Sequence, residues 1–208
     1  MDLKNLTAFR TNHRPGVTYL LYYENPANPH TFYDDACCQY YLVRLLHSLR
    51  HLHLALHAYC ITPAELCLLV TPGTPTGIVR MWNSVAAQYR EYYGNRFRRD
   101  SGNICSSFSS VRIAGFEQTL NAQKYVERLP LARNLSQHPG THRWSSYCSN
   151  AFGAGVSQLT CHRHFKCFLE QAGHCYSSYR EFVAAPFTTR QLADLGISDN
   201  TAEMPLQN

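Results

Sequence analysis

The sequence predicts an α+β domain in which an antiparallel sheet has its helices packed on one face. Three observations support this. Short β-branched and aromatic runs alternate with amphipathic helical stretches, two of the strand runs are only three residues apart, and 208 residues with 45% hydrophobic content suit one sizeable core. We expect residues 1–160 to form the main domain, 161–185 to be a helical extension of it, and 186–208 to be a partly disordered tail.

The first half of the chain carries the turn, cap and periodicity signals of three strands and two helices. Aromatic and β-branched residues fill VTYLLYY between the turn-forming stretches RPG and ENPANP, which is typical of a buried strand. Asp34 or Asp35 can cap the start of the first helix, and Gly94 is expected to end the second. The expected elements are a strand at 17–23, a helix up to 51, strands at 53–61 and 65–71, and a helix at 78–93.

The second half adds one strand and several helices. The expected elements are a basic turn at 96–103, a strand at 104–113, a helix at 116–129 closed by Pro130, a loop-rich region at 130–160, a helical stretch at 162–183 and a short helix at 188–196. The polar end at 198–208 is expected to be disordered. The order β, α, β, β, α, β, α is that of a ferredoxin-like split βαβ sandwich.

The charge balance favours an anionic partner. The net charge is +5, and the basic residues comprise 16 Arg but only 3 Lys. The planar Arg guanidinium matches phosphate and stacks on bases, so this bias favours nucleic-acid contact. Mild basicity without any target is the alternative.

The cysteines and the N-terminal stretch predict where in the cell the protein is located. Nine cysteines would suit a disulfide framework in a secreted domain, but MDLKNLTAFRTNHRPG has no apolar segment followed by a cleavage site. No run of 18 apolar residues is present either, so we expect no membrane partner. The odd number of cysteines and the adjacent Cys37 and Cys38 fit reduced thiols. We therefore expect a cytoplasmic protein.

Two stretches carry three motifs of a known family. They are LALHAYCITPAELCLLVT at 54–71 and KYVERLPLARNLSQHPGTHRWSSY at 124–147. They resemble the REP-associated tyrosine transposases, whose motifs have the forms HAYVxMPNHxHLLxxP, YIxxNPVRAGLV and WxxSSY. The matching residues are His57, Ala58, Tyr59 and Pro63; Tyr125, Val126, Pro130, Leu131, Ala132 and Arg133; and Trp144, Ser145, Ser146 and Tyr147. The resemblance extends over residues 17–183 and implies the same ferredoxin-like fold.

The resemblance implies a chemistry from which this sequence departs. Such transposases cleave single-stranded DNA by attack of a Tyr hydroxyl on a phosphodiester, assisted by a divalent cation that two His and an Asn or Gln hold. Tyr125 stands at the position of the nucleophile, whereas the ligand positions hold Glu65, Cys67 and Leu129. Magnesium and manganese prefer oxygen ligands, so Cys67 is a poor ligand and Leu129 is none. We therefore expect a vestigial Tyr125, no metal-dependent cleavage and no cofactor; magnesium or manganese is needed only if cleavage survives.

Arginines and aromatic residues are interleaved near the end of the second predicted helix, as in surfaces that bind phosphates and stack on bases. Tyr89 and Tyr93 fall on the buried stripe of that helix, which leaves Tyr92 and Phe97 for stacking. The alternative is a solvated helix end with its aromatic residues in the core. The predicted nucleic-acid-binding residues are Arg90, Tyr92, Arg96, Phe97, Arg98, Arg99, Arg112 and Arg133.

A Cys and His cluster occupies CHRHFKCFLEQAGHC, residues 161–175, with spacings that bring side chains to one face of a helix. The candidate zinc ligands are Cys161, His164, Cys167 and either His174 or Cys175. The alternative is a helix whose His is structural. Elsewhere, His47, His51, His53 and His57 are expected at the surface or hydrogen-bonded in the core.

These features predict a transposase-like protein that recognises structured single-stranded DNA, such as a hairpin, through Arg and aromatic contacts. Without cleavage it would serve as a regulator or accessory subunit, and RNA is an alternative target. The second hypothesis is an active single-tyrosine transposase or nickase that cuts and rejoins DNA through Tyr125, with a metal site formed by Glu65 and further ligands that the motifs do not identify. A protein-interaction scaffold is the third. The sequence leaves open the target sequence, any protein partner, and whether the protein is a monomer or a dimer.

Overall fold

A computed structural model describes residues 12–26, 28–154 and 159–197. It contains a four-stranded antiparallel sheet of order β2-β3-β1-β4. The strands are β1 (Thr18–Glu24), β2 (Leu54–Ile61), β3 (Glu65–Pro72) and β4 (Ser109–Ile113). The helices are α1 (Asp35–His51), α2 (Gly77–Phe97), α3 (Phe116–Ala132), the 3-10 helix η1 (Pro139–Thr141), α4 (Tyr147–Phe152), α5 (Arg163–Gln171), α6 (Tyr176–Ala184) and α7 (Thr189–Asp194). The predicted α+β class with its antiparallel sheet is confirmed, and the end at 198–208, predicted to be disordered, lies outside the described residues.

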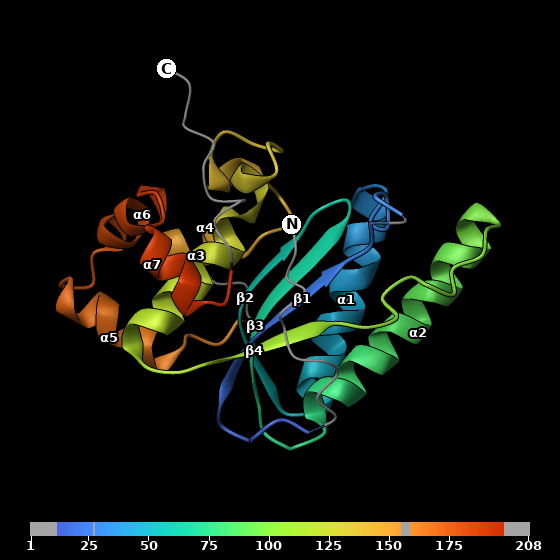
Figure 1. The fold of residues 1–208 in the computed structure, drawn as a ribbon, viewed down its shortest axis with the longest axis horizontal. Helices are drawn as coiled ribbons and strands as arrows, with labels where there is room; N and C mark the ends of the chain where they lie inside the picture. The colour runs from blue at the N-terminus through green and yellow to red at the C-terminus, as the bar shows by residue number, and fades with distance from the viewer. Residues whose placement is uncertain (1–11, 27, 155–158, 198–208) are drawn as a thin grey trace.

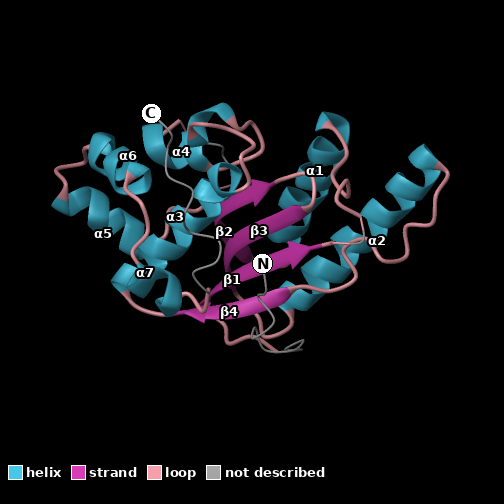
Figure 2. Cartoon of the chain, turned by 45° about the horizontal axis from the view of Figure 1, so that its top comes forward, coloured by secondary structure: helices cyan, strands magenta, loops and turns pink. Residues whose placement is uncertain are grey.

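The β2–β3 hairpin forms as predicted, and β1 lies between β3 and β4 (Figure 2). Tyr22 of β1 lies opposite Cys67 of β3, and Cys67 lies opposite Cys60 of β2. Residues directly opposite one another in antiparallel strands project to the same face of the sheet. These three side chains therefore share one face.

The helices α1 and α2 cover the other face, on the right in Figure 1. Tyr19, Leu21 and Tyr23 project into this core because side chains alternate along a strand. Trp82 of α2 is buried among them and donates its indole N–H to the Cys105 carbonyl over 2.9 Å. The contact holds the segment before β4 against α2.

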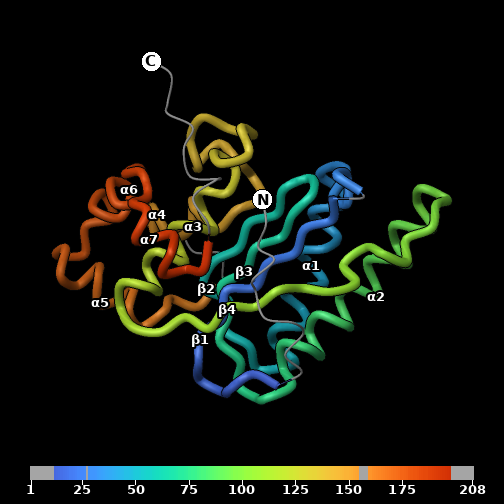
Figure 3. Tube along the Cα trace, viewed as in Figure 1, coloured from blue at the N-terminus to red at the C-terminus, as the bar shows by residue number. Residues whose placement is uncertain are grey.

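The face that carries Cys67 is covered by α3 and α7, which corrects the prediction that helices pack on one face only. Figures 1 and 3 show α7 beside α3, although the two are far apart in the sequence. Leu20 and Cys67 pack in one cluster with Val126 and Leu129 of α3 and Leu192 of α7. The central strands are apolar on both faces, so each face needs a covering layer. Residues 187–197, predicted to belong to a tail, thus contribute to this core.

Both α2 and α3 continue past the residue predicted to end them. The helix α2 passes through Gly94 and ends only before Arg98, which takes a left-handed conformation with φ 51°. The helix α3 passes Pro130, which lies in its last turn, and ends at Ala132. There the missing N–H of proline removes only one helical hydrogen bond. The extra turn brings Arg133 to the end of α3.

Other predicted elements are shorter or divided. The strand predicted at 104–113 is confined to β4, and the helical stretch predicted at 162–183 is divided into α5 and α6. Gly173 separates these two helices with φ 62°, a conformation that favours glycine. The loop-rich region at 130–160 contains η1 and α4. Among the helices of the described ranges, none combines the length and apolar character needed to span a membrane.

The WSSY stretch at 144–147 covers the edge of β2. The Ser146 N–H donates to the Tyr59 carbonyl over 2.9 Å, and the Tyr59 N–H donates to the Ser146 hydroxyl oxygen over 3.1 Å. The Ser146 hydroxyl in turn donates to the buried carboxylate of Glu127 on α3 over 2.8 Å. Covering the edge removes open strand hydrogen bonds that would otherwise pair with another chain. This motif therefore has a structural role, since it connects β2 to α3.

Candidate functional site

The four positions singled out by the resemblance come together between the sheet and α3. Glu65 and Cys67 project from β3 to the same face, as alternate strand residues do. Tyr125 and Leu129 lie one turn apart on the side of α3 that packs against this face. All four side chains are buried, with Glu65 only 2% exposed. Residues 60 positions apart in the sequence thus form one spatial cluster.

The guanidinium of Arg133 neutralises Glu65. Its Nε lies 2.9 and 2.7 Å from the two carboxylate oxygens, and a terminal nitrogen donates to Oε1 over 2.6 Å. The Tyr22 hydroxyl also donates to Oε1, and the Thr62 hydroxyl donates to Oε2 over 3.4 Å. Charge-assisted hydrogen bonds of this kind are the strong ones in proteins, and they compensate the burial of the carboxylate.

These residues do not fit a divalent cation. Both oxygens of Glu65 are engaged, and a cation there would have to displace Arg133 or lie against its positive charge. Burial raises the pKa of the Cys67 thiol, and the nearby Glu65 charge adds to the rise, so the thiolate is strongly disfavoured. Leu129 has no donor atom. Within the described ranges, no group of three or more His, Cys, Asp or Glu side chains is arranged to hold a metal ion.

The surroundings of Tyr125 disfavour the deprotonated phenol that nucleophilic attack requires. The residue is 7% exposed, and its hydroxyl makes no hydrogen bond with any described residue. Burial raises the pKa of the phenol, and Cys67 adds to the rise. A general base must lie within hydrogen-bonding reach of the proton that it removes, and the described residues provide none. The ring of Phe187, from the segment before α7, packs at 6.4 Å between ring centroids and helps to cover Tyr125.

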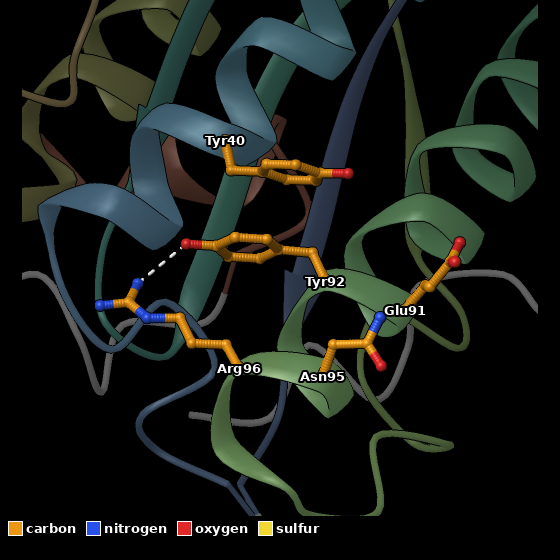
Figure 4. Close-up of a pocket in the computed structure, with 5 residues that line it drawn as sticks. All are labelled: Tyr40, Glu91, Tyr92, Asn95 and Arg96. Carbon is orange, nitrogen blue, oxygen red and sulfur yellow. Dashed lines mark hydrogen bonds between the residues drawn. The ribbon is translucent and has the colours of Figure 1, made fainter.

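Several predicted nucleic-acid contacts are used inside the protein. Arg96 donates to both carboxylate oxygens of Asp34 over 2.9 and 2.5 Å. It also donates to the Tyr92 hydroxyl over 2.9 Å (Figure 4). The Tyr92 ring stacks on Tyr40, with 4.0 Å between centroids and 9° between planes. Arg90 is half-buried and donates to a loop carbonyl over 3.2 Å. These three predicted residues therefore help to join α1, α2 and the loop before β4.

Arg98 and Arg99 remain available to an anionic partner. Both are exposed, and neither forms a hydrogen bond or ion pair with a described residue. Phe97 is half-buried, and its ring lies 5.4 Å from that of Tyr33, which is 59% exposed. Tyr33 is not among the predicted residues, because it precedes α1 in the sequence and meets the end of α2 only in the fold. The end of α2 thus presents two unpaired guanidiniums close to an exposed aromatic ring.

The last two predicted contacts lie elsewhere. Arg133 is committed to the buried ion pair. Arg112 is exposed on β4, where it lies opposite Tyr19 near the start of β1. The end of α2 instead lies beside Asp34, which follows the end of β1. Arg112 is therefore at the opposite end of the sheet from Arg98 and does not belong to the same surface.

The Cys and His side chains at 161–175 do not converge on one point. His164 Nδ1 lies 3.1 Å from the Thr119 hydroxyl, which commits it to α3. Cys161, Cys167 and Cys175 are exposed, the first before α5, the second on it and the third after it. The candidate zinc ligands are therefore not arranged as a site.

Two buried histidines form a hydrogen-bonded chain that ties α5 to the sheet. The Thr18 hydroxyl lies 3.0 Å from His162 Nε2 and 2.9 Å from the Thr71 hydroxyl. The Thr71 hydroxyl in turn lies 2.8 Å from His57 Nε2. His162 Nδ1 accepts the His164 N–H over 3.1 Å, so a proton on Nδ1 would face a donor. Burial, with the nearby His57 charge, lowers the pKa of His162 to about 3. Burial also lowers the pKa of His57.

Comparison with solved structures shows what this fold is similar to. The chain matches the structure of a REP-associated tyrosine transposase bound to a REP hairpin, with a TM-score of 0.59 and 14% sequence identity. The match covers 75% of this chain and 92% of that chain. No family model and no curated protein matches the chain. At this identity the likeness establishes a shared fold, which is the fold that the motifs implied.

Replacing Arg133 with Ala is expected to lower the free energy of unfolding by about 3 kcal/mol or more, because the buried Glu65 carboxylate loses its cation. Urea unfolding followed by tryptophan fluorescence measures the change. Arg143→Ala is the control, because Arg143 pairs with Asp35 over 3.2 Å at the exposed surface. Its loss is expected to cost less than about 1 kcal/mol. Equal costs in the two variants would contradict a stabilising role for the buried pair.

Acidification is expected to destabilise the protein through His162. Its pKa is lowered from 6.5 to about 3 in the folded state, so the unfolded chain binds more protons as pH falls below 6.5. Each pH unit below that point costs about 1.4 kcal/mol for this proton. His162→Asn keeps an N-cap acceptor for α5 but does not titrate, so its unfolding free energy should fall less steeply between pH 6.5 and 5.

The control for this measurement is His138→Asn. His138 is exposed and accepts the Gly140 N–H over 3.0 Å as the N-cap of η1, so it has a similar capping role without the burial. Urea unfolding at several pH values compares the two variants with the unmodified protein. A pH dependence in His162→Asn as steep as that of the unmodified protein would exclude His162 as its source.

Proposed function

We propose that this protein is a relative of the REP-associated tyrosine transposases that binds structured single-stranded DNA, such as a hairpin. In this proposal it does not carry out the metal-dependent cleavage of that DNA. The observation that carries the proposal is the ion pair of Arg133 with Glu65, where the resemblance implies a metal ligand. The guanidinium supplies a positive charge permanently, but it has no open coordination position for a phosphate oxygen and cannot act as a Lewis acid. Binding without cleavage suits a regulator or an accessory subunit.

The end of α2 supplies the chemistry for binding. Arg98 and Arg99 offer forked N–H donors that match the oxygens of a phosphate. Tyr33 exposes a ring on which an unpaired base can stack, and Phe97 supports that ring from the protein side. The likeness to a transposase bound to a REP hairpin supports this class of ligand. A hairpin presents both phosphates and unpaired loop bases, and RNA of similar shape is the alternative ligand.

The cysteines support a cytoplasmic location for this activity. All nine lie within the described ranges and none is paired in a disulfide. Five are buried, where a thiol packs as a small apolar side chain, and four are exposed. Exposed free thiols persist in a reducing compartment, whereas oxidising compartments favour their pairing.

The protein is expected to bind a labelled DNA hairpin, with affinity falling steeply as salt rises because phosphate contacts release counterions. The double variant Arg98→Ala/Arg99→Ala should bind about ten-fold more weakly and should reduce the log–log salt slope by about 1.4 to 1.8. Fluorescence anisotropy measures both quantities.

The double variant Arg163→Ala/Arg190→Ala is the matched control for this experiment. It removes the same charge from exposed positions on α5 and α7, so it should leave the affinity nearly unchanged. Equal losses in the two double variants would indicate a general charge effect instead of a surface at the end of α2. Absence of any binding at low salt would favour the protein-interaction scaffold.

Incubation with hairpin DNA and magnesium or manganese is expected to give no covalent protein–DNA adduct, because Tyr125 has no hydrogen-bonded base and its neighbours do not fit a cation. Denaturing electrophoresis with end-labelled DNA measures adduct formation. Tyr125→Phe is the matched variant, and it should bind the hairpin as well as the unmodified protein does. An adduct that forms with the unmodified protein and disappears in Tyr125→Phe would establish an active nickase.

A further inference from the structure

The loop between α2 and β4 carries a serine close behind the two arginines that are proposed to bind phosphate. The sequence at 98–101 is RRDS, and Arg98 and Arg99 are the only adjacent pair of arginines in the chain. Many protein kinases select a serine through carboxylates of the kinase that bind arginines two and three residues before it. Ser101 has arginines at both positions, which is typical of a substrate of an arginine-directed serine kinase.

The fold leaves this serine within reach of an enzyme. Residues 98–100, 102 and 103 are exposed, and Ser101 among them is half-buried. The end of α2 and the loop after it project from the body of the molecule in Figures 1 and 2. The loop is next anchored at Cys105, whose carbonyl accepts the indole N–H of Trp82. A kinase can therefore contact residues 98–103 while the core stays folded.

The Ser101 hydroxyl packs against α2 and forms no hydrogen bond with a described residue. A Cβ atom at Gly94 would lie 3.2 Å from Ser101 Oγ, so the glycine permits this close approach. The hydrogen bonds of the loop are local. Asp100 Oδ1 accepts the Gly102 N–H over 2.9 Å, and the Ser101 carbonyl accepts the Ile104 N–H over 3.0 Å. The loop can therefore extend into the active site of a kinase without breaking a helix or a strand.

Two other serines follow an arginine by three residues, and the fold makes both unsuitable. Ser136 follows Arg133, whose guanidinium is committed to the buried ion pair, and the Ser136 hydroxyl oxygen is itself buried. Ser146 follows Arg143 and is fully buried, with its hydroxyl donating to a carboxylate on α3 over 2.8 Å. Ser101 thus combines the arginines with accessibility, whereas these two serines do not.

We propose that Ser101 is a phosphorylation site for an arginine-directed serine kinase, and that its phosphate blocks hairpin binding at the end of α2. In the reaction, Ser101 Oγ bonds to the γ-phosphorus of ATP and the bond from that phosphorus to ADP breaks. The hydroxyl proton passes to the aspartate base of the kinase. The effect on binding rests on the proposed function, because Arg98 and Arg99 are the proposed phosphate-binding residues.

A phosphate on Ser101 competes with DNA for these two guanidiniums. Phosphoserine carries a charge of about −1.5 to −2 at pH 7 and three strong acceptor oxygens. Arg98 and Arg99 are exposed and form no ion pair with a described residue, so they can donate charge-assisted hydrogen bonds to the phosphate. The phosphate also lies beside the last turns of α2, where the negative end of the helix dipole favours its pairing with cations. Guanidiniums that are paired in this way are withdrawn from DNA, and the added negative charge repels the DNA backbone.

The test treats the folded 208-residue protein with ATP and the catalytic subunit of cyclic-AMP-dependent protein kinase, an arginine-directed serine kinase. Tandem mass spectrometry should locate the phosphate on Ser101. Ser106 and Ser107 are internal controls, because both are exposed in the same loop but follow no pair of arginines. They should remain unmodified.

Two double variants test whether the arginines direct the reaction. Arg98→Ala/Arg99→Ala should lose most of the phosphorylation at Ser101. Arg163→Ala/Arg190→Ala removes the same charge elsewhere and should be phosphorylated as fast as the unmodified protein.

Fluorescence anisotropy then compares the binding of a labelled DNA hairpin before and after phosphorylation. The phosphorylated protein should bind about ten-fold more weakly, with a log–log salt slope lower by about 1.4 to 1.8, because two phosphate contacts are lost. Ser101→Ala, treated with the same kinase and ATP, should keep the affinity of the untreated protein. Circular dichroism checks that the phosphorylated protein is folded.

The outcomes separate the phosphorylation site from the proposed function. An unmodified Ser101, or phosphate spread equally over Ser101, Ser106 and Ser107, would overturn the site and leave hairpin binding standing. A phosphorylated Ser101 with unchanged hairpin affinity would overturn the block of binding. Failure of the unmodified protein to bind the hairpin would overturn the proposed function and the block together, while phosphate located on Ser101 would still establish the site.

Discussion

The Glu65 carboxylate is buried between the sheet and α3, and the organisation of this site depends on the positive charge that Arg133 supplies to it. The helix α3 delivers the guanidinium only because it continues past Pro130. Once the pair is formed, the surrounding side chains can be apolar, and the Tyr125 hydroxyl is packed without a polar partner among the described residues. The interaction that stabilises this core thus also engages both carboxylate oxygens of Glu65.

The C-terminal segment strengthens this arrangement by covering α3. Lys124 is buried with its ammonium 4.8 Å from the ring centroid of Phe182 and 4.6 Å from that of Phe187, and burial, with the nearby Arg128 charge, lowers its pKa to about 8. Arg128 donates to the Val183 carbonyl over 2.6 Å at the end of α6. These contacts fix the helix that carries Tyr125 between the sheet and the C-terminal helices. A nucleophile needs access to its substrate, whereas this environment favours rigidity and exclusion of water.

The fold decides which arginines of this basic protein can contact a ligand. The excess of arginine indicated an anionic partner. However, Arg96 and Arg133 form ion pairs with acidic residues of the protein itself, and Arg90 donates to a backbone carbonyl. Exposed arginines without an ion pair to a described residue include Arg98 and Arg99 at the end of α2 and Arg44 and Arg80 on the neighbouring part of α1 and α2. The stacked rings of Tyr40 and Tyr92 belong to these two helices. Charges spread along two helices suit a polyanion better than a compact small ligand.

The sequence by itself determined the order of strands and helices, because apolar periodicity and turn residues are local signals. The resemblance of its motifs singled out Glu65, Cys67, Tyr125 and Leu129, which the fold does bring together. Only the tertiary structure decided which group neutralises Glu65, since Arg133 is 68 residues away along the chain. It also placed α3 on the second face of the sheet and decided which arginines stay unpaired. Such pairings depend on which elements meet in space, and no local pattern in one sequence encodes that.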